Sequence, residues 1–349
     1  TRTELPWEPI ELRGDIRAFS FSDDGSIFVT GDLSGDIHVF RTEDGKILAS
    51  LTGSGSSFQY VSLSSDSTQL VTTGNDGSVD IWSPHAIPDT GPVEELIGHQ
   101  SGSFIVFAAY NDDGTRIVSA GHDKSVIVWD ADSGAMLRRH TGHEVEPRFA
   151  EFVPGGSRVV SVDWAGNVHV WSVETGEVLV RIEHDPAILL SAGAVHGGPH
   201  GTLRWLGPRM ESIVSPEGQR VIVHDGIVMR VHDLDDGTVL CTLEDSRQWG
   251  VALPSFSPDG RFITSNAFLS NRTCVWDAAT GRVVATLGGH QGPVTMASFD
   301  PTSTKVLTAS LDRAARLFDT QSGELVFEFP GYTVFVLGAR FDKSGGRIA

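Results

Sequence analysis

The stretch FIVFAAYNDDGTRIVSAGHDKSVIVWDADSGAMLR, residues 104–138, decides the fold because it contains one complete copy of a repeating unit. Its apolar runs are separated by short polar turns, and residues 125–129 alternate as a half-buried β-strand does. Glycine ends two of the turns, at Gly114 and Gly134, because it accepts a positive φ angle without steric cost. The stretch therefore predicts four short strands joined by tight turns.

The same unit recurs about every 42 residues along the chain. One landmark is a polar turn after an apolar strand, which starts at Ser22, Ser64, Asn111, Val153, Ser215, Ser257, Asp300 and Asp342. A second landmark is an aromatic residue that closes a β-like run, at Phe40, Trp82, Trp129, Trp171, Trp276 and Phe318, with His232 in the same position. A period in this range with four short strands per unit is typical of the blade of a β-propeller.

We therefore expect an all-β chain that forms a single propeller of four-stranded antiparallel blades over residues 1–349, with seven complete repeats and a partial eighth. Tyr332 begins the eighth repeat and Ala349 lies inside its second strand, so the count is compatible with a seven- or an eight-bladed ring. Trp7–Gly14 is similar to an outer strand without its blade. Because an interrupted blade exposes unpaired strand edges, we expect the native chain to be longer than this segment.

One interval between turns is about 20 residues longer than the others, and the extra residues lie around 184–208. Their glycines and prolines predict a loop. His196 and His200, with His184 nearby, could supply half of a metal site. Zinc usually requires three or four ligands, and no cysteine or carboxylate cluster accompanies these histidines. A surface loop with incidental histidines is the favoured interpretation, and we expect no metal and no cofactor.

The charge balance limits the kinds of partner. The 349 residues include 26 basic and 45 acidic side chains, a formal net charge of −19. Nucleic acids and anionic membranes require a basic surface, so neither is expected as a partner. No apolar run approaches the roughly 18 residues of a membrane span. The two cysteines, Cys241 and Cys274, form no metal or disulfide pattern, which predicts a reducing, cytoplasmic compartment. The scarcity of lysine suggests a GC-rich, bacterial genome.

Two short motifs recur at the repeat spacing. One is a Gly-His dipeptide, at Gly98-His99, Gly142-His143 and Gly289-His290. The other is an aromatic residue followed by aspartate, at Trp129-Asp130, Trp276-Asp277 and Phe318-Asp319. In both motifs the repeats resemble the WD40-repeat family, and the resemblance covers nearly the whole chain.

The resemblance implies a buried hydrogen-bond chain of histidine, aspartate, serine or threonine, and tryptophan within a blade. Repeat three has all four residues: His99, Asp123, Ser119 and Trp129. Repeat seven has His290, Asp312 and Thr308 with Phe318, and repeat two has Asp76, Thr72 and Trp82 without a histidine. The other repeats depart at the aspartate position (Ser34, Ala165, Gly226 and Ser270), and we expect their blades to depend more on apolar packing.

A serine, a histidine and an aspartate could also form a catalytic triad. The set recurs at blade spacing and includes a tryptophan that a triad does not need, so the structural role is favoured.

The residue before the tight-turn aspartate points to one face of the propeller in this family. The seven positions are Leu33, Asn75, His122, Trp164, Asp225, Leu269 and Leu311. Three leucines and a tryptophan there suggest a partner-binding rim, because apolar surface and tryptophan are common in protein interfaces. The alternative is that these side chains fold over their own blades. That alternative is favoured for each leucine alone and is even with binding for Trp164.

We therefore expect a non-catalytic scaffold or sensor module that binds a partner protein, or another domain of the same polypeptide, on a propeller rim. The alternative is an enzyme with an active site at the mouth of the central channel. Turn carboxylates such as Asp24 and Asp113 are plentiful, but bonding within the turns already explains them. The sequence contains no nucleophile motif, phosphate loop or metal-ligand cluster, so the non-enzymatic function is preferred.

Overall fold

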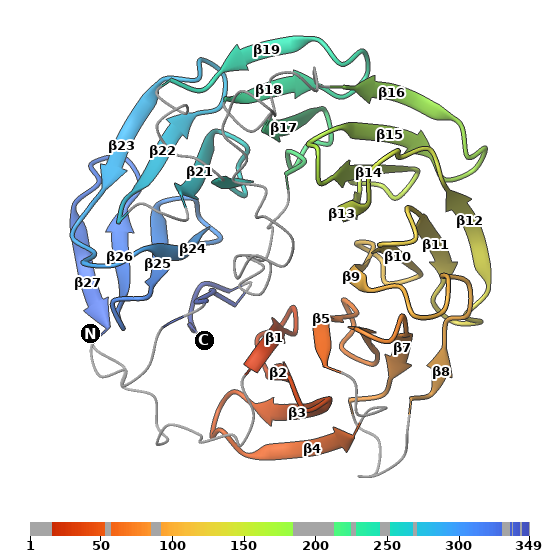
Figure 1. Ribbon diagram of the computed structural model, residues 1–349. Helices are drawn as coiled ribbons and strands as arrows, with labels where there is room; N and C mark the ends of the chain where they lie inside the picture. The colour runs from red at the N-terminus through yellow and green to blue at the C-terminus, as the bar shows by residue number, and fades with distance from the viewer. Residues whose placement is uncertain are drawn as a thin grey trace. The chain divides into compact units, whose positions relative to one another are not determined.

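The computed structural model describes residues 16–52, 57–84, 92–183, 213–224, 228–244, 252–267, 271–329, 336, 338–342 and 344–348. All the regular elements in these ranges are β-strands, and they form seven separate sheets (Figure 1). None of the described residues belongs to a helix that could cross a membrane. The prediction of an all-β fold is confirmed. The chain divides into two compact units, residues 1–164 with 169–178, and residues 165–168 with 179–349, which are described one at a time.

The first unit contains three complete four-stranded sheets. The first sheet is β1 (Ile16–Phe21), β2 (Ile27–Asp32), β3 (Asp36–Arg41) and β4 (Ile47–Thr52). The second is β5 (Phe58–Leu63), β6 (Leu70–Gly74), β7 (Val79–Trp82) and β8 (Glu94–Glu95). The third is β9 (Ile105–Tyr110), β10 (Arg116–Gly121), β11 (Val126–Asp130) and β12 (Met136–His140). The boundary between the units passes through the fourth sheet, β13 (Pro147–Phe152), β14 (Arg158–Asp163), β15 (Val168–Ser172) and β16 (Val178–Ile182).

The second unit contains the last three sheets. The fifth is β17 (Arg220–His224), β18 (Met229–Asp233) and β19 (Val239–Thr242), with Val214 bridged to β17 on its free side. The sixth is β20 (Ala252–Phe256), β21 (Phe262–Ala267), β22 (Thr273–Asp277) and β23 (Val283–Leu287). The seventh is β24 (Val294–Phe299), β25 (Lys305–Ser310), β26 (Ala315–Asp319) and β27 (Leu325–Phe329).

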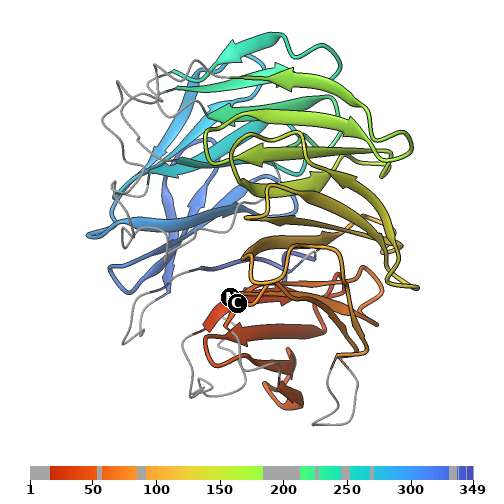
Figure 2. The same ribbon diagram turned by 45° about the vertical axis from the view of Figure 1, so that its right-hand side comes forward.

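Each sheet is a meander, because its strands pair in chain order and neighbouring strands run antiparallel. In the first unit the first strands pack against one another, β1 on β5, β5 on β9 and β9 on β13. Figure 2 shows these sheets following one another as twisted layers. Short turns and strand pairing within one repeat explain why each repeat forms its own sheet, and why its last strand lies at an open edge. Seven such sheets make this a seven-bladed β-propeller fold.

The aromatic landmark of the sequence lies in the core. Each of these residues is on the third strand of its sheet and is at most 1% exposed: Phe40, Trp82, Trp129, Trp171, Trp276 and Phe318. A fully buried tryptophan or phenylalanine stabilises a domain by a few kcal/mol relative to an exposed one. The repeat therefore places one large side chain where two layers of apolar residues meet.

The turn landmark keeps one geometry even where its sequence changes. In the first repeat the Gly25 N–H donates to the Ser22 carbonyl at 2.9 Å, and Gly25 has a φ of 66°. In the second repeat the Ser67 N–H donates to the Ser64 carbonyl at 2.9 Å, and Ser67 has a φ of 61°. A serine there carries the left-handed strain of about 1 kcal/mol that glycine avoids. The copies with a serine at this position, Ser67 and Ser303, are thus strained versions of the same turn, whereas the copies that start at Val153 and Asp342 keep a glycine there.

The eighth repeat begins beside the seventh sheet. The Val336 N–H donates to the Ser310 carbonyl at 3.2 Å, and the Thr295 hydroxyl donates to the Val336 carbonyl at 2.8 Å. Beyond it, Phe341 and Ile348 form an isolated antiparallel bridge. The described part of this repeat therefore adds no further sheet. The expected strand at residues 7–14 and loop at 184–208 lie outside the described residues, and the single-domain prediction stays a prediction.

Candidate functional site

The predicted rim residues occupy equivalent places on their sheets. In three repeats of the first unit the backbone N–H of the rim residue donates to the residue just before the same repeat's first strand: Asn75 to Ser57 (3.2 Å), His122 to Phe104 (2.8 Å) and Trp164 to Glu146 (3.1 Å). In the second unit, Leu311 donates to Pro293 at 3.0 Å. These bonds anchor the turn between the second and third strands at one end of each sheet. Asp225 and Leu269 lie outside the described residues.

The rim residues of the first unit are partly exposed and partly packed. We call this surface the turn face, and it consists of Leu33, Asn75, Phe104, His122 and Trp164. Its four predicted members are half-buried, and the Phe104 side chain is 46% exposed. The Phe104 and His122 rings meet edge to face at 5.5 Å. Leu311 of the second unit is also half-buried. Each rim side chain thus rests on its own sheet while keeping accessible surface.

Trp164 lies over a charged group. The Arg148 guanidinium is 5.8 Å from the centre of the Trp164 ring, a distance at which a cation and an aromatic face attract each other. Burial lowers the pKa of Arg148, and the negative charge of Asp163 acts in the opposite direction. Trp164 therefore covers a buried charge and also presents an aromatic surface.

The third sheet contains the complete hydrogen-bond chain. The Trp129 indole N–H donates to the Ser119 hydroxyl at 2.8 Å, Ser119 is 2.7 Å from His99 Nε2, and His99 Nδ1 is 3.0 Å from the Asp123 carboxylate. A neutral His99 with its proton on Nδ1 satisfies every donor and acceptor in this chain. A Cβ at Gly98 would lie 2.6 Å from the Trp129 ring, so the close approach of this segment requires glycine.

This arrangement is unsuited to catalysis. The side chains of His99 and Asp123 are 1% and 0% exposed. Ser119 is fully buried and already accepts a hydrogen bond from tryptophan. A substrate carbonyl cannot approach a nucleophile in that position, because an attacking oxygen must come within about 3 Å of it. The chain of residues satisfies buried polar groups instead.

The seventh sheet has a related network with an added arginine. His290 Nε2 is 2.7 Å from the Thr308 hydroxyl and His290 Nδ1 is 3.0 Å from Asp312. Burial lowers the pKa of His290, although the charge and hydrogen bond of Asp312 act against it. Arg316 donates to Asp312 at 2.8 Å and to Glu328 at 2.9 Å. In the second sheet, which lacks the histidine, the Trp82 indole still donates to Thr72 at 2.8 Å.

The fourth sheet differs from the expectation of mainly apolar packing. His143 Nε2 is 2.8 Å from the Ser161 hydroxyl, and His143 Nδ1 is 3.4 Å from the carboxylate of Asp163. The aspartate thus comes from two positions before Ala165, which occupies the expected position. The same type of side chain reaches the histidine from another position and direction, and residue spacing gave no signal for it.

Three buried histidines meet in this region. One ring nitrogen from each of His140, His143 and His169 lies within 4.8 Å of the others, close enough to consider a metal ion. However, the rings of His143 and His169 stack at 4.0 Å with only 12° between their planes. Metal ions bind along the lone pairs in the ring plane, and two parallel stacked rings do not direct theirs to one point. Both nitrogens of His143 also face Ser161 and Asp163. The cluster is a packing and hydrogen-bonding feature in this geometry.

The comparisons identify the repeats. The sequence model of the family "WD domain, G-beta repeat" matches residues 10–41, 45–83, 90–130 and 281–319. Translation initiation factor 3 subunit I of Pyricularia oryzae is 39% identical over 95 residues, 27% of either chain. Meiotic recombination protein rec14 of Schizosaccharomyces pombe is 30% identical over 117 residues, 33% of this chain and 38% of that protein. WD repeat-containing protein 1 of Rattus norvegicus is 38% identical over 79 residues, 22% of this chain and 13% of that one.

These relatives are matched over less than half of their length, and they are eukaryotic, so they do not support the predicted bacterial origin.

Solved structures match over nearly the whole chain. The computationally designed protein Ika8 has a TM-score of 0.72 at 25% identity, with coverage of 95% of this chain and 92% of the other. The C-terminal WD40 domain of Sif2 has a TM-score of 0.75 at 16% identity, with coverage of 96% and 92%. Proteins with these repeats are generally interaction scaffolds without enzymatic activity, and this general role is supported here. The four matched segments, the seven sheets and these structures show that the chain contains WD40 repeats and has the fold of a WD40 β-propeller.

Proposed function

We propose that this protein is a non-catalytic interaction module that binds a partner protein through the turn face of its first unit. The partner is a separate protein or another domain of a longer polypeptide, and the module acts as a scaffold or sensor in the cytoplasm. The net charge of −19 favours a partner with a basic surface.

The observation that carries this proposal is the partial exposure of the rim side chains. Four turns of one unit present Leu33, Asn75, His122 and Trp164 at equivalent positions, and all four are half-buried. Backbone hydrogen bonds hold Asn75, His122 and Trp164 in place. Phe104 adds an aromatic ring that is 46% exposed. Rigid, partly exposed aromatic and aliphatic groups contribute most of the energy of protein interfaces, because little conformational entropy is lost on binding.

The test is the variant Trp164→Ala. We expect it to lose proteins that the wild-type module retains in affinity purification from cell extract, because truncation removes a central aromatic contact. Its unfolding temperature should change little, since the ring covers Arg148 only from the outside and a cation–π contact contributes about 1 kcal/mol.

Val284→Ala on the outer strand β23 is the matched control, because Val284 is 36% exposed and lies away from the turns. It should retain the same proteins as the wild type. A large drop in the unfolding temperature of Trp164→Ala would make Trp164 a packing residue. Unchanged retention by that variant would exclude the turn face as the binding surface.

A further inference from the structure

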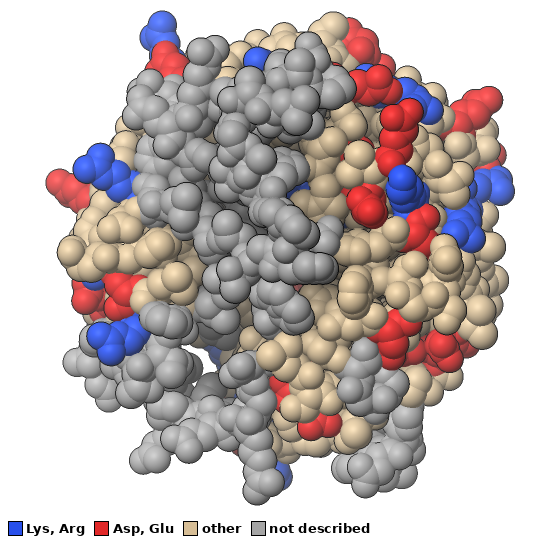
Figure 3. Space-filling model, viewed as in Figure 1, with Lys and Arg blue, Asp and Glu red and all other residues tan. Residues whose placement is uncertain are grey.

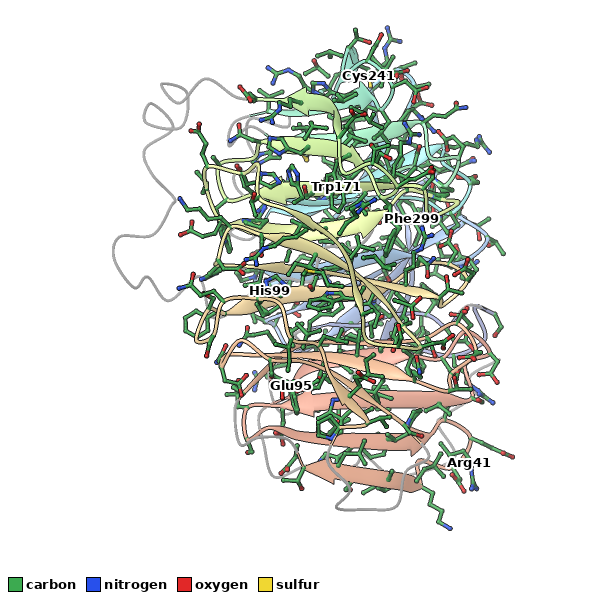
Figure 4. All side chains as sticks on the ribbon, turned by 90° about the vertical axis from the view of Figure 1, so that its right-hand side faces the viewer. Arg41, Glu95, His99, Trp171, Cys241 and Phe299 are labelled. Carbon is green, nitrogen blue, oxygen red and sulfur yellow. The ribbon has the colours of Figure 1, made fainter. Side chains whose placement is uncertain are left out.

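The first unit contains a cleft of about 570 Å³ beside the outer half of the second sheet. Its polar wall consists of Asp76, Asp80 and Glu95, and its apolar wall includes Trp82 and Leu96. The segment that leads into the third sheet closes it on one side. Glu95 and His99, both labelled in Figure 4, lie on the same side of the unit and both line this cleft. None of the described residues that line it is a lysine or an arginine.

Asp80 is the unusual member of this wall. It is only 6% exposed, and it lies directly opposite Glu95 in the pairing of β7 with β8. The pKa of Asp80 is raised to about 6, mainly by burial and in part by the charges of Glu95 and Asp76, while the Ser78 hydroxyl acts in the opposite direction. A buried carboxylate is normally paired with a cation or bonded to several N–H groups. No such ion pair of Asp80 occurs among the residues that the structure describes.

In the seventh sheet, the position equivalent to Asp80 holds an arginine that has acidic partners. Asp80 lies two residues before Trp82 on the third strand, and Arg316 lies two residues before Phe318. Arg316 pairs in register with Glu328, as Asp80 does with Glu95. The guanidinium of Arg316 lies between two carboxylates, 2.8 Å from Asp312 and 2.9 Å from Glu328. The second sheet keeps acidic residues at both flanking positions and has an aspartate in place of the arginine.

The third sheet supports the same comparison. There Arg139, paired in register with Ile127, occupies the place of Glu95 and donates to Asp123 at 3.2 Å. Two sheets of this chain therefore place an arginine of their own beside the tight-turn aspartate. The second sheet instead lines an open cleft with carboxylates.

We propose that this cleft receives an arginine side chain of the partner protein, with its guanidinium between Asp80 and Glu95. The proposal rests on the proposed interaction function and names the chemistry of one contact. The planar guanidinium matches paired carboxylates, and its aliphatic stem can pack on Pro92 and Ile97, two exposed residues that also line the cleft. Ile97 and Val93, which are 83% and 66% exposed, add apolar surface near the opening for the residues that flank the arginine.

A small metal ion fits this wall less well. A chelating site requires oxygens from several groups within a few ångströms of one another. Asp76, Asp80 and Glu95 do not bring one carboxylate oxygen each within 4.8 Å of the others. Among the described residues, only His140, His143 and His169 place three possible ligand atoms that close together. A long side chain with a wide, delocalised charge can contact carboxylates that are too far apart for one ion.

The experiment is a titration of the full chain with the peptide acetyl-Gly-Arg-Gly-amide, followed by calorimetry and by the NMR signal of the Trp82 indole N–H. We expect saturable binding in the millimolar range or tighter, and no binding of the same peptide with citrulline in place of arginine. Citrulline keeps the shape and removes the charge. Equal binding of both peptides, or no binding of either, would overturn the proposal.

Two variants locate the site. Asp80→Asn keeps the shape of the side chain and should weaken the binding of the arginine peptide at least about tenfold, because a charge-assisted contact is lost. Asp112→Asn changes the net charge equally at an exposed turn and should leave the affinity unchanged. Asp80→Arg recreates the Asp312–Arg316–Glu328 arrangement, so it should abolish peptide binding and raise the unfolding temperature. Equal affinity of wild type and Asp80→Asn would refute the site.

Two further measurements distinguish an arginine site from a metal site, and the cleft proposal from the turn-face proposal. Calcium chloride in place of the peptide should not shift the Trp82 signal, and a saturable shift would show a metal site instead. If the partner from affinity purification still binds Asp80→Asn as tightly as wild type, the cleft is not used although the interaction function stands. If the arginine peptide binds but Trp164→Ala retains every partner, the arginine site in the cleft is supported and the turn face is excluded as the binding surface.

Discussion

Asp123 is the residue on which the buried network of the third sheet depends. It accepts hydrogen bonds from His99, Ser125 and the backbone of Gln100 while its side chain is fully buried. Asp123→Ala should lower the free energy of unfolding by about 3 kcal/mol, because it leaves several buried donors without an acceptor. Chemical denaturation monitored by tryptophan fluorescence measures this change.

Asp112→Ala, at an exposed turn of the same repeat, is the control and should cost less than about 0.5 kcal/mol. Equal stability of Asp123→Ala and wild type would mean that the network does not stabilise the sheet.

The same carboxyl makes stability depend on pH. Burial would raise the pKa of Asp123, but the hydrogen bonds from His99, Ser125 and the Gln100 backbone N–H outweigh burial and hold the pKa well below its ordinary value of 3.8. The unfolded chain then binds the proton more readily, so Asp123 stabilises the fold above that ordinary value. Its contribution is lost as the pH falls toward the folded pKa.

We therefore expect the difference in unfolding free energy between wild type and Asp123→Asn to be constant from about pH 7 to pH 5 and to shrink below about pH 4. Urea titrations at several pH values test this, and a difference that grew as the pH fell would contradict the assignment.

At the scale of single elements, the outer strand β27 departs from the alternating pattern of a half-buried strand. Leu325, Val326 and Phe327 follow one another and are 51%, 50% and 38% exposed. β27 is the last strand of its sheet, and no strand among the described residues pairs with its outer edge, so this apolar run can pair with another chain. Natural edge strands often carry lysine for this reason.

Val326→Lys should therefore reduce light scattering on heating or concentration, with a change of less than about 0.5 kcal/mol in unfolding free energy. Gln321→Lys adds the same charge at an exposed turn without removing an apolar side chain. If both variants scatter equally less light than wild type, net charge is the cause and the edge strand is not.

At the scale of the whole molecule, the excess of acidic side chains should oppose folding. The formal net charge is −19. Figure 3 shows acidic groups at many places on the described part of the face that is in view. Like charges repel more strongly in the compact state than in the unfolded chain, and salt screens that repulsion. The unfolding temperature should therefore rise by a few degrees between about 0.01 M and 0.15 M sodium chloride at neutral pH. Calorimetry at several salt concentrations measures it, and a falling temperature would show that attractive ion pairs dominate.

The repeat pattern predicted most of the architecture because each repeat forms its sheet from neighbouring strands. Trp129 closes a strand in the sequence and is buried in the structure, and Ser119 and Asp123 stand at distances along the chain that a regular β-meander brings together. The fourth sheet shows the limit of that reasoning. Asp163 stands at the wrong spacing yet lies 3.4 Å from His143, because contact depends on the direction of a side chain as well as its position.

The sequence by itself determined the strand repeat and the buried aromatic residues, since both follow from local periodicity, and its short recurring motifs carried the resemblance to the WD40-repeat family. Only the tertiary structure revealed that Asp80 lies opposite Glu95 beside a cleft, and that Arg316 holds the equivalent place between Asp312 and Glu328. Strand register within one sheet brings these charges together, and the spacing of the repeat along the chain does not specify that register. Whether a buried charge has a partner can be judged only when its surroundings are known.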